Sequence, residues 1–366
     1  MRGEHARHGK AAHSPPPEAH EIFDTVCQAL REGLFAEAID ALESLLEHDV
    51  EFPGAASALK CAGFWREQQE RDPGAPGGPG DPRRAGSALE GFERGEQLLG
   101  QWRLFQAFAA RLADTPERCL FAIKQFVFSS ALASYGATGG GSGATGGGSG
   151  AAGAGFDAAG SGRDEAAPSD AEAGEDPYLL LQIGRCHKGL GNYERAIECL
   201  EHANRQTRED ARVLAELADC YSLVNESRAA KVFFREAFYV DPQAVDLAGL
   251  ESPLVNRLAA RLREKGYVEP LLNEWIPVYG AVWGVFNVKR EMKPLEFGKL
   301  KQAIYHLEKE RRIPGPEGER AVPRLINRYF WLIDHYLTTG EPRERVEEVL
   351  QKLKETDPVV HEAYTT

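Results

Sequence analysis

Cysteine and histidine side chains stand near one another in one stretch of this sequence, and these residue types could bind a metal ion. Cys199 and His202 are three positions apart, and Cys186 and His187 precede them. Thiolate and imidazole at such short spacing are ligands that Zn²⁺ accepts. A free thiol on an apolar helix face also packs as a small hydrophobe. The repeat described below places Cys186 on such a face, so we expect buried thiols and no metal site.

A second stretch with possible chemistry is the glycine-rich run GGGSGATGGGSG, which lies within residues 136–176. Glycine-rich loops bind phosphate when a strand precedes them and Gly-Lys-Ser/Thr follows, and neither signal is present here. The composition instead predicts a flexible insertion with a reach on the order of 35 Å. The sequence also has no nucleophile–base pairing and no nucleotide fingerprint. We therefore predict a protein that is not an enzyme and has no cofactor.

The charge and hydropathy of the chain narrow its class further. Its 56 acidic and 43 basic residues give a formal charge of −13, which argues against a general nucleic-acid binder. The most apolar stretch, residues 271–288, is interrupted by Asn273, Glu274 and Pro277, whereas a membrane span needs roughly 20 apolar residues. Residues 1–17 are polar and have no signal-peptide core. These features predict a cytoplasmic protein whose six cysteines are not in disulfides.

The elements that would position such residues are helices, and the clearest of them recur in the sequence. When residues 177–210 are laid over residues 211–244, the same residue types recur 34 positions apart. Small residues recur where two helices must approach each other closely, and larger apolar residues recur beside them. The matched pairs are Ile183 with Leu217, Gly184 with Ala218, Cys186 with Cys220, Ala196 with Ala230, Leu200 with Phe234, and Ala203 with Ala237.

Each copy of this unit has the signals of a helical hairpin. In the first copy, Asp176 and Pro177 suit the N-cap and first position of a helix. Gly191 and Asn192 interrupt that helix, and a second helix is predicted over residues 193–206. One hairpin cannot bury its own apolar stripe, so neighbouring hairpins must stack on it.

A period of 34 with small residues at these offsets resembles the tetratricopeptide repeat family. The resemblance implies an all-α solenoid of helical hairpins. It is clear over residues 177–244 and weaker over residues 18–49 and 327–358. In the last of these, we predict a helix over residues 323–338 after a Pro/Gly loop at 313–322.

These observations divide the chain into five predicted regions. They are a disordered tail at residues 1–17, a helical region at 18–135, the glycine-rich insertion at 136–176, two repeats at 177–244, and degenerate repeat-like helices at 245–366. Closing a loop of about 40 residues instead of a short turn costs only about 2 kcal/mol more. One solenoid across the insertion and two separate helical domains both remain open.

The resemblance also implies a function as a protein-interaction scaffold. In this family the inward face of each first helix forms a concave surface that holds a peptide or helix of a partner. Leu181 and Asp219 stand at two positions of the carboxylate clamp of chaperone-binding members, so that clamp is not carried over. Arg185 and Lys188 are expected at an open surface. The predicted binding residues are Tyr178, Leu181, Arg185 and Lys188 in the first repeat, and Arg212, Ala215, Asp219 and Ser222 in the second.

Two other functions remain as alternatives. The basic section at residues 289–301 could let a regulatory or assembly factor contact membrane or nucleic acid, although Glu291 and Glu296 dilute its charge. A noncatalytic subunit could also self-associate through an uncapped end of the solenoid. The main expectation is a protein partner, with neither nucleic acid nor membrane bound.

Overall fold

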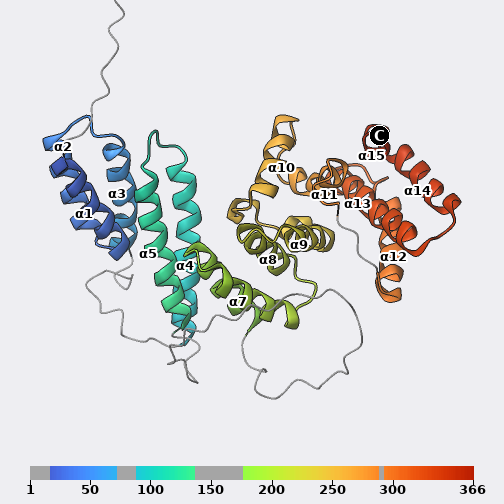
Figure 1. Cartoon of the computed structure of the whole chain (residues 1–366), viewed down its shortest axis with the longest axis horizontal. Helices are drawn as coiled ribbons and strands as arrows, with labels where there is room; N and C mark the ends of the chain where they lie inside the picture. Colours follow the sequence, from blue (N-terminus) through green and yellow to red (C-terminus); the bar gives the residue numbers. More distant parts are fainter. Residues whose placement is uncertain (1–16, 72–87, 137–175, 288–291) are drawn as a thin grey trace, which may run out of the picture. The chain divides into compact units, whose positions relative to one another are not determined.

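The computed structural model describes residues 17–71, 88–136, 176–287 and 292–366. Over these residues all regular secondary structure is helical, with fifteen α-helices and two short 3₁₀ helices. This confirms the predicted all-α fold of helical hairpins (Figure 1). Residues 1–16 of the predicted tail, nearly all of the predicted insertion and residues 289–291 of the basic section lie outside the described residues. The chain divides into two compact units between residues 173 and 174.

The described part of the first unit contains five helices, and their core is rich in aromatic residues. Phe35 and Trp65 stack with ring centroids 6.1 Å apart, and Phe126 meets Phe35 edge-on at 5.1 Å. Gly33 ends the first helix with φ of +77°, and a Cβ atom there would lie 2.2 Å from the Phe126 ring. Glycine is therefore required at this turn for both its conformation and its size. The helices are α1 (Pro17–Glu32), α2 (Phe35–His48), α3 (Ala55–Arg71), α4 (Ala88–Ala109) and α5 (Glu117–Gly136).

The second unit begins with the two repeated hairpins. They consist of α6 (Pro177–Gly189) with α7 (Tyr193–Gln206), and α8 (Ala211–Leu223) with α9 (Ser227–Val240). The Asp176 carboxylate accepts a hydrogen bond from the Tyr178 backbone N–H, which confirms the predicted N-cap. A Cβ atom on Gly184 would lie 2.7 Å from Cγ of Leu200, so the hairpin packs closely at the predicted small residue. Cys186 and Cys220 are buried thiols, as the repeat register predicts.

The rest of the second unit continues with less regular helices. One prediction there is wrong: α13 begins at Pro316, inside the predicted Pro/Gly loop, and runs through Pro323. Proline removes one helical hydrogen bond, and burial of Ala321, Pro323 and Leu325 in this helix offsets that loss. The remaining elements are η1 (Pro242–Ala244), η2 (Leu247–Gly249), α10 (Pro253–Glu264), α11 (Leu271–Val282), α12 (Pro294–Glu310), α13 (Pro316–Thr339), α14 (Arg343–Thr356) and α15 (Pro358–Thr365).

Three apolar clusters join the second unit together. The first contains residues of α6, α7 and α8. The second contains residues of α8, α9, α10 and α11 and of the segment before α10. The third centres on α13, where Tyr329, Phe330 and Trp331 are almost fully buried. Among the described helices, none has an apolar stretch long enough to cross a membrane.

Candidate functional site

The first helices of the two repeats, α6 and α8, carry all the residues predicted to bind a partner. These residues differ greatly in exposure. Leu181, Lys188, Ala215 and Asp219 are buried, whereas Arg212 is exposed. Tyr178, Arg185 and Ser222 are intermediate. The predicted face therefore has a closed end around Lys188 and an open end around Arg212.

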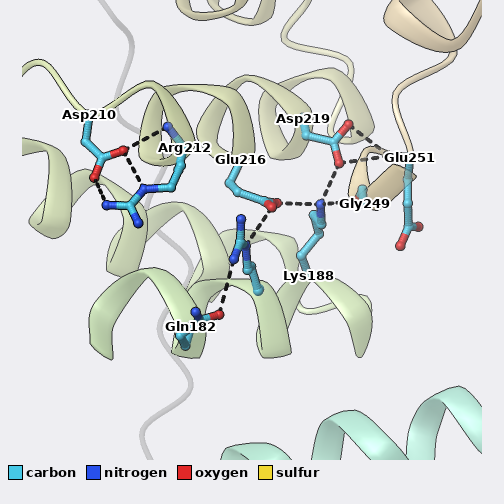
Figure 2. A network of polar contacts seen from close by, with 9 residues as sticks. Gln182, Lys188, Asp210, Arg212, Glu216, Asp219, Gly249 and Glu251 are labelled. Atoms are coloured by element: carbon cyan, nitrogen blue, oxygen red, sulfur yellow. Dashed lines mark hydrogen bonds and ion pairs between the residues drawn. The ribbon is translucent and has the colours of Figure 1, made fainter. Parts of the chain in front are cut away.

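The closed end is a network of buried charges, shown in Figure 2. Lys188 Nζ on α6 donates to Glu216 Oε2 at 2.5 Å and to Asp219 Oδ2 at 2.8 Å on α8. Arg185 Nε donates to the other oxygen of Glu216 at 2.7 Å. The Lys188 side chain is only 4% exposed, and that of Asp219 is fully buried. Two cations thus face two carboxylates away from water.

A segment from outside the repeats completes this network. We call residues 245–252, between η1 and α10, the covering segment. Its Gly249 carbonyl accepts from Lys188 Nζ at 2.9 Å, and its Ser252 backbone N–H donates to Asp219 Oδ1 at 2.7 Å. Its buried apolar residues, Val245 and Leu250, belong to the same cluster as Ala215 of α8. The covering segment therefore occupies part of the face that a partner was expected to contact.

The charges in the network shift one another's pKa values. Burial by itself would lower the pKa of Lys188, but the adjacent Glu216 and Asp219 outweigh burial and raise it. Burial would raise the pKa of Glu216, but Lys188 and Arg185 outweigh that effect and lower it. Burial raises the pKa of Asp219, and Lys188 offsets this only in part. The Asp219 carboxylate accepts hydrogen bonds from Lys188 Nζ and from the backbone N–H groups of Glu251 and Ser252, which fits its ionised form.

The expectation that Lys188 lies at an open surface is consequently wrong, and Arg185 is also largely covered, with a side chain 15% exposed. Removing one member of a buried ion pair leaves an uncompensated charge. These residues therefore stabilise the arrangement of α6, α8 and the covering segment. Sequence reasoning missed Glu216. The available signal was its spacing of three from Asp219, which matches the spacing of Arg185 and Lys188 on α6.

The open end presents an aromatic ring and a guanidinium group. Arg212 lies over the Tyr178 ring, with its Cζ atom 5.6 Å from the ring centroid. Asp210 positions the guanidinium group through a 2.7 Å hydrogen bond from Arg212 Nη2 to Oδ2. The Arg212 side chain remains 45% exposed. Beside it lies an open cavity of about 580 Å³, which Arg208, Arg212 and Asp241 help to line.

The predicted Cys/His stretch and the basic section were the other places with possible metal or anion binding. In the part of the chain that the structure describes, no group of three or more His, Cys, Asp or Glu side chains could hold a metal ion. The Nε2 atom of His202 lies 3.1 Å from the side-chain Nε2 atom of Gln206. In the basic section, Lys299 is paired with Glu209 at 3.0 Å, and Lys301 lies over the Phe297 ring at 4.9 Å. These contacts offset part of the positive charge of that section.

Comparison with known protein families gives a match over the first repeat. Residues 177–210, which span α6 and α7 up to the start of α8, match the family model described as tetratricopeptide repeat. No curated protein matches the chain. The match falls on the hairpin that carries Arg185 and Lys188.

Proposed function

We propose that this chain, in which residues 177–210 match the tetratricopeptide repeat model, is a noncatalytic scaffold that binds a peptide or helix of another protein. The proposed contact is the open end of the repeat face, around Tyr178 and Arg212. The observation that carries this proposal is the exposed guanidinium group over an aromatic ring beside an open cavity. Arginine and tyrosine are enriched among the residues that dominate protein interfaces.

The closed end supports the open end without touching the partner. Lys188 donates to two carboxylates and one carbonyl, so its three N–H groups are all used. Its raised pKa keeps it protonated, which removes the lone pair that a nucleophile or base would need. We therefore assign Arg185, Lys188 and Asp219 to positioning the face. Leu181 and Ala215 contribute buried apolar area. The hydroxyl groups of Ser222 and Ser252 form a hydrogen bond of 2.6 Å.

We also propose that the protein is located in a reducing compartment such as the cytoplasm. None of the six cysteines, all of which lie in the described residues, is in a disulfide, and five of them are buried. Structural disulfides are rare where glutathione keeps thiols reduced. Labelling of the full chain in cells, followed by fractionation, tests this part of the proposal.

The binding experiment compares two charge reversals on the same hairpin region. Arg212→Glu replaces the exposed cation of the open end, whereas Arg205→Glu makes the same charge change on the outer helix α7. Both residues are exposed, so both variants should fold with changes in stability within about 0.5 kcal/mol. Partners captured from native cells by the full chain and quantified by mass spectrometry should be lost with Arg212→Glu and retained with Arg205→Glu. Retention of every partner by both variants rules out the open end.

A further inference from the structure

A second cleft lies at the end of α8 away from Arg212, where Ser222 and the start of α9 meet the helix α10 and the residues after α11. Its volume is about 490 Å³, within the usual range for ligand sites. Lys231 of α9, Arg257 and Arg261 of α10, and Trp283 after α11 all line it. Among the residues that the structure describes, no Asp or Glu lines it.

The three cations of this cleft have no carboxylate partner among the described residues. Lys231 Nζ donates to the amide oxygen of Asn287 at 3.5 Å, and Arg257 Nε donates to the Pro253 carbonyl at 3.1 Å. Arg261 lies over the Trp283 ring at 3.9 Å. By contrast, Arg263 on the same helix is paired with Glu269 at 2.9 Å. The cleft thus keeps its positive charge in a chain whose formal charge is −13.

The geometry of Arg261 suits recognition of a carboxylate. A guanidinium group that stacks on an aromatic ring keeps its N–H donors in its own plane, where they can form paired hydrogen bonds with a carboxylate. Arg257 is four residues earlier on α10, so it lies on the same helix face and can donate to the same anionic group. Leu254 and Trp283 add apolar surface next to these donors.

We propose that this cleft binds an acidic segment of a partner protein, with carboxylates at Arg257 and Arg261 and an apolar side chain against Trp283. This inference rests on the proposed scaffold function and adds a second contact, separate from the open end of the repeat face. Charges are screened over about 8 Å at physiological salt. A short acidic segment is therefore attracted by the positive charge of the cleft. A long polyanion such as nucleic acid is also repelled by the net negative charge of the whole chain.

The test uses the full chain and a fluorescein-labelled peptide with two glutamates on each side of a phenylalanine. Its counterpart has glutamine at all four acidic positions, and binding is measured by fluorescence anisotropy. The glutamate peptide should bind more tightly than the glutamine peptide. The double variant R257Q/R261Q should weaken binding of the glutamate peptide by at least about tenfold. R263Q removes a cation from the same helix outside the cleft, and it should change binding by less than about twofold.

Several results would overturn the proposal. They are absence of peptide binding to the unaltered chain, equal affinity for the two peptides, and equal loss in R263Q and R257Q/R261Q. Displacement of the peptide by millimolar inorganic phosphate would assign the cleft to phosphate instead. If R257Q/R261Q does not fold, as judged by circular dichroism, the single variant K231Q replaces it with the same expected direction. Arg205→Glu, at an exposed position of α7, should leave peptide binding unchanged. Capture of native partners by Arg212→Glu is a separate readout, so failure of the cleft and failure of the open-end contact give different results.

Discussion

Replacing Lys188 by methionine gives the sharpest test of the buried network. Methionine keeps much of the side-chain volume but removes the charge and three N–H donors. Glu216 and Asp219 then remain buried without the cation that both contact at 2.8 Å or less. Breaking a buried ion pair in this way costs about 3–5 kcal/mol. We therefore expect a large fall in the free energy of unfolding, measured by urea denaturation with circular dichroism at pH 7.

A matched substitution at an exposed lysine separates the effect of losing a buried cation from the effect of losing a lysine in general. Lys299 is also paired with a carboxylate, Glu209, but its side chain is 57% exposed. An exposed ion pair contributes about 0–1 kcal/mol, so Lys299→Met should lower the unfolding free energy far less than Lys188→Met. Equal losses in the two variants would refute the conclusion that the position of Lys188 in the network stabilises the fold.

The pH dependence gives an independent check. The pKa of Lys188 is raised on folding, so its contribution is present below its unfolded pKa of about 10.4 and is lost as pH rises above the folded value. The pKa of Glu216 is lowered, so its contribution is present above about pH 4.3 and is lost as pH falls through the folded value. At pH 7 both contributions are therefore present in the unaltered chain.

Without Lys188, burial should raise the pKa values of Glu216 and Asp219 above those of the unfolded chain. The folded variant then binds more protons than its unfolded form, and its stability rises as pH falls. The difference between Lys188→Met and the unaltered chain should therefore be smaller at pH 5 than at pH 7. A difference that stays constant or grows over this range contradicts the assigned electrostatics.

Two further predictions concern packing and thiol reactivity. Ala196 is fully buried between the helices of the first repeat, so Ala196→Leu should lower the free energy of unfolding by about 1–3 kcal/mol; an unchanged urea midpoint would contradict this packing. Burial raises the pKa of Cys61 to about 11, so its thiol should be protonated at pH 8. Iodoacetamide labelling of the native chain, followed by mass spectrometry, should modify Cys61 more slowly than the less buried Cys199; equal rates would contradict the burial of Cys61.

The sequence by itself determined the helices of the repeats and their pairing. Asp176 and Pro177 start α6 where predicted, and α7 has the predicted bounds, residues 193–206. Gly184 lies against Leu200 as the repeat pattern requires. These features depend on capping, helix-breaking residues and a regular spacing of small side chains, which act over a few residues and are visible in a linear pattern. Where such signals conflict, as at Pro323, burial decided the outcome and the predicted helix start was wrong.

The exposure of the candidate site was decided only by the tertiary structure. Lys188 occupies a position that the repeat pattern assigns to an open face, yet it bonds to Gly249, which is 61 residues away. The second cleft likewise brings together Lys231, Arg257 and Trp283 from three different elements. A charged side chain is exposed or buried according to which distant segment packs over it, and the repeat period carries no information about the chain beyond the repeats. The sequence could therefore identify the face, whereas only the packed chain separates its open end from its closed end.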